Sequence, residues 1–139
     1  MRAAGRGMLC AAAGSVDRLT VSRVNSIPGN HPRFSFPATV AVGGAAQARA
    51  VARALCALRA GPRGPIFCPI DLGVTYRLDF TAAGRSFPAV TIRAGGCEEV
   101  SGAGLARWIE GKPTFWTVLG LAMGLTNPGH NTFAGTTPS

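Results

Sequence analysis

The strictly alternating stretch from residue 74 to residue 80 constrains the fold of this chain more than any other feature. Apolar side chains occupy every second position of it, namely Val74, Tyr76, Leu78 and Phe80. Alternation with a period of two is typical of a strand that has one buried and one solvated face. After a turn at residues 81–85, residues 87–93 predict the return strand of a hairpin, with a bulge at Pro88.

Two further strands are expected before this hairpin. Residues 19–24 alternate apolar and polar side chains, and after a turn at residues 25–31 the pattern resumes at residues 33–36 and 39–42. Pro37 interrupts this second strand. Because proline donates no hydrogen bond to a neighbouring strand, we expect the second strand at an edge of the sheet or with a bulge.

Helical spacing appears twice. Ala48, Val51, Leu55 and Leu58 form one apolar stripe and predict a helix over residues 45–59. A second apolar stripe, with Thr114 as N-cap and Gly124 as C-terminal cap, predicts a helix over residues 114–124. Residues 101–111 are glycine-rich and ambiguous, and within them residues 105–109 fit either a short strand or a helical turn.

The order strand, strand, helix, hairpin, helix predicts an α+β fold, in which two helices pack on a small antiparallel sheet of about four strands. The 139 residues are enough for one domain, which we place at residues 16–127. Residues 1–15 and 128–139 are expected to lie outside it, the latter as a flexible tail. No apolar run approaches the roughly 18 residues of a membrane-spanning helix.

The first fifteen residues have some features of an export signal. Two arginines precede a short apolar stretch at residues 7–14, and Ala11 to Ala13 offer a cleavage site of the A-x-A type. Three interpretations stay open: a truncated or mis-started signal, the end of a low-complexity linker, and a disordered tail. Cys10 is also a candidate for lipid attachment, although residues 7–9 do not match the usual motif before a lipidated cysteine.

The net charge of +8 raises the question of a polyanionic partner. Thirteen of the fourteen cationic side chains are arginine, and they are scattered along the chain without a basic cluster. Together with 23 alanines, this composition resembles that of proteins from GC-rich actinobacterial genomes. A solvated surface is therefore the favoured interpretation, and nucleic acid is not expected as a partner.

The cysteines allow several pairings. If Thr81 opposes Arg85 in the hairpin, Cys68 faces Glu98, and one bulge would bring Cys68 opposite Cys97. We favour a Cys68–Cys97 disulfide, with Cys56–Cys68 or no disulfide as alternatives.

No recognised catalytic or cofactor motif is present. A catalytic triad could be assembled from Asp71, Ser101 and His130 only by an arbitrary selection. The adjacent Glu98 and Glu99 should point to opposite faces of an extended segment, so shared acid–base catalysis is not expected of them. With no C-x-x-C pair and only two histidines, no metal site or cofactor is expected. The chain is therefore predicted not to be an enzyme.

One segment resembles a known family. A helix ending at Ala57–Leu58, a Gly/Pro loop, and a Cys68-Pro69 pair that opens a hairpin closing at Cys97 resemble the Streptomyces subtilisin inhibitor family. The resemblance covers roughly residues 45–97. It implies an inhibitory loop with the following residues: Phe67, Cys68, Pro69, Ile70 and Asp71.

By position, the resemblance makes Cys68 and Pro69 supports of the loop. Ile70 would enter the primary pocket of a protease, and Asp71 would follow the scissile bond. The chain also resembles uncharacterised exported actinobacterial proteins in general. The expected function is a small extracytoplasmic binding domain, secreted or envelope-associated, whose partner is an extracellular serine protease. The alternative is a structural or assembly module that meets another envelope protein.

Overall fold

The alternating stretch is the longest strand of an antiparallel sheet, as predicted. In the computed structural model, β4 (Val74–Ala82) buries its four apolar side chains and pairs with β6 (Val90–Arg93). The structure describes residues 8–25, 34–60, 73–95, 98–104, 106–109 and 114–135.

The hairpin turn and its bulge follow from two local features. Ala83 and Gly84 both have positive φ, 52° and 80°, as a two-residue turn of type I′ requires. Ala82 pairs with Arg85 in β5 (Arg85–Ser86), so the register is one residue away from the Thr81–Arg85 pairing considered above. Phe87 N–H donates to Phe80 O, whereas Val90 pairs with Leu78. Residues 88 and 89 therefore oppose Asp79 alone, and the bulge predicted at Pro88 is confirmed.

The sheet is larger than expected. Its order is β2-β1-β4-β6-β7-β8-β3, with β5 paired only to the end of β4, and every pair of neighbouring strands is antiparallel. The remaining strands are β1 (Arg18–Asn25), β2 (Thr39–Ala41), β3 (Arg59–Ala60), β7 (Glu99–Ser101) and β8 (Arg107–Trp108). The α+β class is confirmed and the count of about four strands is wrong. The missed strands have only two or three residues, too few to show a period.

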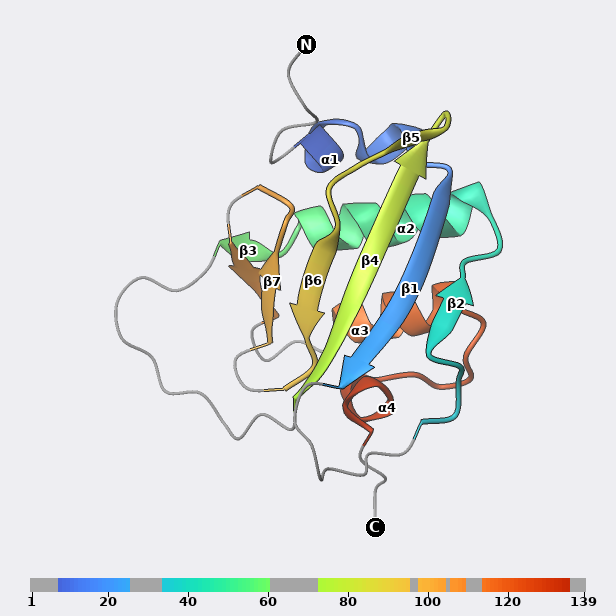
Figure 1. The fold of residues 1–139 in the computed structure, drawn as a ribbon, viewed down its shortest axis with the longest axis vertical. Coiled ribbons are helices and arrows are strands. Elements are labelled where there is room, and N and C mark those ends of the chain that lie inside the picture. Colours follow the sequence, from blue (N-terminus) through green and yellow to red (C-terminus); the bar gives the residue numbers. More distant parts are fainter. Residues whose placement is uncertain are drawn as a thin grey trace.

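The first two predicted strands differ in outcome. β1 extends the predicted stretch by one residue at each end and pairs with β4 from Arg18–Thr81 to Asn25–Val74. The second strand is confined to β2, because residues 34–38 are not extended. β2 lies at the edge of the sheet, as Pro37 predicted (Figure 1).

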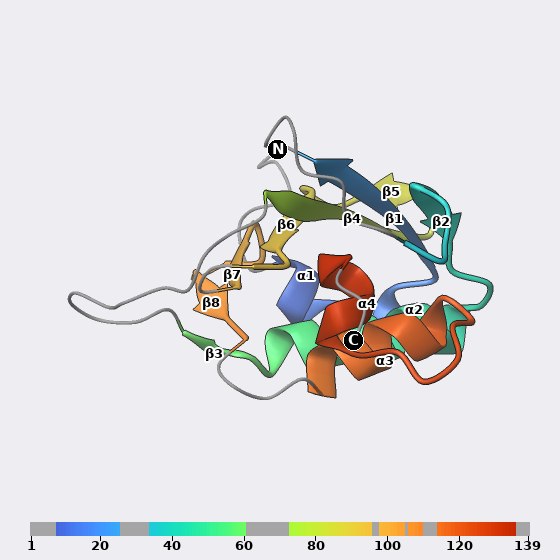
Figure 2. The same cartoon turned by 90° about the horizontal axis from the view of Figure 1, so that it is seen from below.

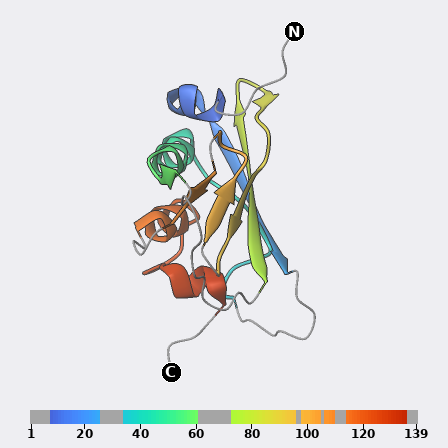
Figure 3. The same ribbon diagram turned by 90° about the vertical axis from the view of Figure 1, so that its left-hand side faces the viewer.

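The described helices lie on one face of the sheet. They are α1 (Met8–Ala11), α2 (Ala45–Cys56), α3 (Thr114–Ala122) and α4 (His130–Ala134). Figure 3 shows the sheet side-on with these helices to one side, and no described helix lies on the other face. Figure 2 shows that the sheet curls toward the helices at its β8–β3 end. The core lies between the two layers.

The two long helices begin at the predicted residues and end before the predicted ones. α2 buries Ala48, Val51 and Leu55, and it stops three residues before the predicted end because β3 begins at Arg59. At the end of α3, Gly124 has a φ of 85°, and its N–H donates to Leu121 O while Leu125 N–H donates to Gly120 O. This pair of bonds is the Schellman arrangement, so the glycine cap is confirmed.

Both predicted tails are wrong for the described residues. Residues 8–15 form α1 and a 3-10 turn, and Leu9 and Ala13 are buried against α2. Residues 130–134 form α4, in which Phe133 is fully buried. Both segments therefore belong to the packed core. In the described parts of the chain, no helix has the length and apolar character needed to cross a membrane.

Candidate functional site

The inhibitory loop predicted from the sequence lies outside the described residues. This applies to Phe67, Cys68, Pro69, Ile70 and Asp71, and also to Cys97, so the Cys68–Cys97 pairing stays a prediction. The structure does describe the residues on both sides of segment 61–72. These two flanks, and the side chains that hold them, define the candidate site.

The flank before the segment is an edge strand. Arg59 and Ala60 of β3 pair with Trp108 and Arg107 of β8. The guanidinium of Arg107 supports the same flank, since its Nη1 donates to Leu58 O at 2.8 Å and to Cys56 O at 3.0 Å. The chain is therefore held in place immediately before it enters the segment.

The flank after the segment lies inside the sheet. Gly73 is buried, and Val74 begins β4, where it pairs with Asn25. On the other side, Ala94 N–H donates to Val74 O at 3.0 Å. The Ala94 carbonyl in turn accepts a hydrogen bond from His130 Nε2 of α4. Because a carbonyl only accepts, this nitrogen carries the proton.

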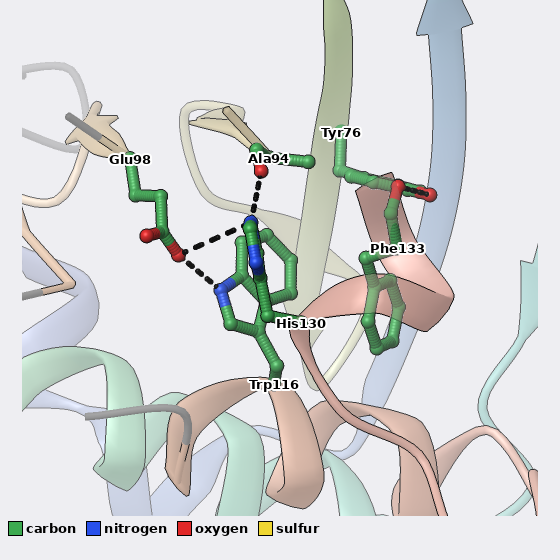
Figure 4. A network of polar contacts seen from close by, with 6 residues as sticks. All are labelled: Tyr76, Ala94, Glu98, Trp116, His130 and Phe133. Atoms are coloured by element: carbon green, nitrogen blue, oxygen red, sulfur yellow. Dashed lines mark hydrogen bonds and ion pairs between the residues drawn. The ribbon is translucent and has the colours of Figure 1, made fainter. Parts of the chain in front are cut away.

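A carboxylate connects His130 to α3 (Figure 4). Glu98 Oε1 accepts a hydrogen bond from Trp116 Nε1 at 2.6 Å and lies 3.7 Å from His130 Nε2. Trp116 is fully buried, whereas the side chains of His130 and Glu98 are partly exposed. A hydrogen bond to a charged acceptor is stronger than one between neutral groups. The link therefore ties α3 and α4 to the chain beside Val74.

The backbone of Glu98 is held in an uncommon conformation. Its φ is 53°, in the left-handed region that a non-glycine residue adopts at some energetic cost. Two backbone bonds fix it, because Glu98 N–H donates to Gly95 O and Glu98 O accepts from Ile109 N–H. Ile109 follows β8, so Glu98 also connects this link to the strand that pairs with the other flank.

An aromatic cluster lies beneath this link. The Phe133 ring packs with its centroid 4.9 Å from Trp116 and 5.3 Å from Tyr76, and Tyr76 OH donates to Phe133 O at 2.6 Å. Burial raises the pKa of the Tyr76 phenol well above its ordinary value, and the charge of Arg23 offsets only part of that rise. Tyr76 is therefore a neutral structural donor.

The disulfide that the structure describes differs from every pairing considered from the sequence. Cys10 of α1 is bonded to Cys56, the last residue of α2, with Cα atoms 5.5 Å apart. The Cys56–Cys68 alternative is therefore wrong. Cys10 was placed outside the fold because its surroundings are small and alanine-rich, and this excluded it as a partner. Its bond to Cys56 also means that its sulfur is not carrying a lipid.

The other candidate residues lie as follows. Ser101 is exposed on β7, and within the described residues His130 contacts Ala94, Glu98 and Trp116. Asp71 lies outside the described residues. Glu98 turns toward Trp116 while Glu99 is exposed, in line with opposite directions for the pair. Among the described residues, no group of three His, Cys, Asp or Glu side chains could hold a metal ion.

Comparisons with known proteins add no relative. No family model, no curated protein and no solved structure matches this chain. The functional interpretation therefore rests on the residues and their geometry.

Proposed function

We propose that this chain is an extracytoplasmic, non-enzymatic binding domain whose contact segment is residues 61–71. Within that class, we propose a protease inhibitor of the subtilisin-inhibitor type. Cys68 and Pro69 support its loop, Ile70 fills the primary pocket of the protease, and Asp71 follows the bond that the protease would cleave.

The observation that carries the proposal is the support on both flanks of this segment. Arg59–Ala60 are fixed by β8 and Arg107, and Val74 is fixed by β1, Ala94 and the link from His130 through Glu98 to Trp116. A substrate-like loop binds tightly when its ends are ordered in advance, because less conformational entropy is lost on binding. A Cys68–Cys97 disulfide would add to this ordering, since it would join the segment to residue 97, next to Glu98.

The Cys10–Cys56 disulfide supports the proposed location. Structural disulfides persist in oxidising compartments and are rare where thiols are kept reduced. The bond joins segments 46 positions apart in the sequence. It therefore favours a secreted or envelope-associated protein over one that stays in a reducing compartment.

The test is titration of a panel of subtilisin-like serine proteases with the purified chain. We expect stoichiometric inhibition of at least one protease, with the Ile70–Asp71 bond intact by mass spectrometry after long incubation. No inhibition across the panel, or rapid cleavage between Ile70 and Asp71, would refute the inhibitor proposal.

A variant of the supporting link makes this test specific. Trp116→Phe removes the indole donor to Glu98 while keeping an aromatic ring, so we expect a folded protein with a less ordered flank. Its inhibition constant should rise roughly three- to tenfold, the effect of about one additional ordered group in the binding loop. Leu121→Ala is the matched control, because Leu121 is also on α3 and is 58% exposed to solvent. The control should inhibit as the unmodified chain does.

The uncovered face of the sheet favours a second candidate, an envelope-associated structural or assembly module. This face carries hydroxyl and arginine side chains, among them Thr20, Ser22, Arg77 and Thr91. Trp116 does not belong to such a surface because it is fully buried, and Trp108 is half-buried. Sedimentation of the chain alone and with envelope extracts tests this candidate, and a monomer under all conditions counts against it.

A further inference from the structure

The two sulfurs of the Cys10–Cys56 bond have different electrostatic surroundings. Arg107 Nη2 lies 3.8 Å from Cys10 Sγ. The guanidinium is held there by the bonds from Nη1 to Cys56 O and Leu58 O, and its buried Nε finds no partner among the described atoms. A fixed positive charge therefore lies next to the sulfur of Cys10.

Cys56 meets the same guanidinium through its backbone and not through its sulfur. It is the last residue of α2, where the carbonyl groups of the final turn carry the partial negative charge of the helix, and Arg107 Nη1 offsets part of that charge by donating to Cys56 O at 3.0 Å. A thiolate is therefore favoured at Cys10, whose sulfur the guanidinium contacts directly, over one at Cys56. Cys10 Sγ also lies 3.8 Å from Ala103 O, and this is a contact without a hydrogen bond because the sulfur of a disulfide carries no proton. The partial charge of one carbonyl is smaller than the full charge of Arg107 at the same distance.

We propose that the Cys10–Cys56 bond is a directed site of thiol–disulfide exchange with an external dithiol. The first thiolate of the dithiol attacks Cys56 Sγ, forms a mixed disulfide there, and displaces Cys10 as a thiolate beside Arg107. The second thiolate of the dithiol then attacks the mixed disulfide and releases Cys56, which takes a proton from water. Two electrons reduce the Cys10–Cys56 bond while the dithiol is oxidised to its disulfide.

The surroundings of the bond allow this reaction in the folded protein. Both cysteine residues are partly exposed, and the proposal requires that a thiol reaches Cys56 Sγ without global unfolding. Opening the bond removes the covalent link between α1 and α2, whose contact then depends on the packing of Leu9 and Ala13, and it leaves the next residues attached. Arg49 Nε still donates to Val16 O at 2.9 Å, and Asp17 N–H still donates to Thr81 O. The Cys10–Cys56 bond is therefore a local link that can be reduced and re-formed in the folded protein. This inference is independent of the proposed inhibitory function.

The test uses the full, oxidised chain with a monothiol, glutathione, as the probe. The reaction is stopped with acid, remaining thiols are alkylated, and peptides are mapped by mass spectrometry, which separates this bond from any that involves Cys68 or Cys97. We expect glutathione on Cys56 and the alkyl group on Cys10. Glutathione found mainly on Cys10, or equally on both sulfurs, would overturn the proposal, and this readout requires no variant.

Two arginine variants test the role of the guanidinium. Arg107→Gln should slow opening by glutathione roughly three- to tenfold, the effect expected when the leaving thiolate loses a stabilising charge. Arg107→Lys should retain most of the rate. If Arg107→Gln merely loosened the structure, the disulfide would open faster. A slower rate therefore indicates a lost stabilising charge, and a faster rate indicates loosening. Arg49→Gln is the matched control, because it removes another arginine-to-carbonyl bond that holds the N-terminal segment. Equal effects of Arg107→Gln and Arg49→Gln, or faster opening in Arg107→Gln, would overturn the proposal.

Discussion

The two ends of the described chain are attached to the fold by different physical means. At the N-terminal end, Leu9 and Ala13 bury small or medium side chains, and a disulfide joins Cys10 to α2. At the C-terminal end, Phe133 lies among aromatic rings, and Tyr76 OH bonds to its carbonyl group. A covalent bond therefore adds to modest packing at one end, whereas aromatic packing and a hydrogen bond hold the other.

The difference follows from how much surface each end can bury. A buried aromatic side chain removes about 150–250 Å² from water, worth roughly 4–6 kcal/mol at 25 cal/mol per Å². An alanine-rich turn buries far less apolar area. A disulfide therefore contributes a larger share of the stability with which that end is attached. The two ends should therefore respond to different perturbations, as the following predictions state.

The largest expected effect is at the C-terminal end. Phe133→Ala removes the ring that contacts Phe36, Tyr76 and Trp116 and leaves a cavity in the core. We expect the free energy of unfolding, measured by urea denaturation, to fall by about 3–5 kcal/mol. Leu121→Ala, at an exposed position, should change it by less than about 0.5 kcal/mol. A loss below about 1 kcal/mol for Phe133→Ala would contradict packing as the means of attachment.

Removal of the disulfide should come next. The double variant Cys10→Ser, Cys56→Ser opens a link between residues 46 positions apart, which corresponds to about 2–4 kcal/mol of stability. Limited proteolysis should then cut before Ala13 while α4 stays protected. The unmodified chain treated with a reductant should behave in the same way. Equal loss of protection at both ends would show that the two attachments are not independent.

Neither attachment was predicted from the sequence, whereas several features between the two ends were. The hairpin, the edge position of β2, the bulge at Pro88 and the cap at Gly124 were all predicted, because each depends on a local pattern or on the backbone geometry of one residue. The short strand β7 was not predicted, and β8 was one of two alternatives left open for residues 105–109, since two or three residues carry no period. Their pairing is decided by tertiary packing.

The supporting link of the candidate site could not be found from the sequence. Glu98 precedes β7, Trp116 lies in α3 and His130 begins α4, and no short motif relates the three residues. Trp116 is buried on α3 although it lies outside the apolar stripe that predicted this helix, which consists of Phe115, Val118, Leu119, Ala122 and Met123. Gly120 is also on the buried face, and its lack of a side chain allows close approach of Pro128. The flanks of segment 61–72 could be anticipated only from the hairpin that begins at Val74.

That close approach gives a smaller but specific prediction. A Cβ atom at Gly120 would lie 2.1 Å from Cβ of Pro128, so Gly120→Ala must push the chain before α4 away from α3. We expect a loss of about 1–3 kcal/mol in the free energy of unfolding, as for other overpacked cores. Gly43→Ala is the control, because a Cβ atom added to Gly43 would meet nothing within 4 Å. Similar losses in the two variants would contradict a steric cause.

The smallest expected effect concerns pH and uses the fact that Tyr76 is the single tyrosine of the chain. Burial raises the pKa of its phenol in the folded state above the ordinary value of about 10, so above pH 10 the unfolded chain loses this proton while the folded chain keeps it. The phenol therefore stabilises the fold fully below pH 10. Above that pH its contribution should fall by up to about 1.4 kcal/mol per pH unit.

The measurement is the tyrosinate absorbance of the folded chain, followed together with its circular dichroism. At pH 11, the unmodified chain should show tyrosinate only to the extent that it has unfolded, whereas in urea the same chain should titrate near pH 10. Tyr76→Phe removes the titrating group, and its stability should depend less steeply on pH above 10, although it is lower at neutral pH because Phe133 O loses its donor. A folded chain that titrates normally near pH 10 would show that Tyr76 is accessible to water, and the C-terminal attachment would then be looser than the N-terminal one.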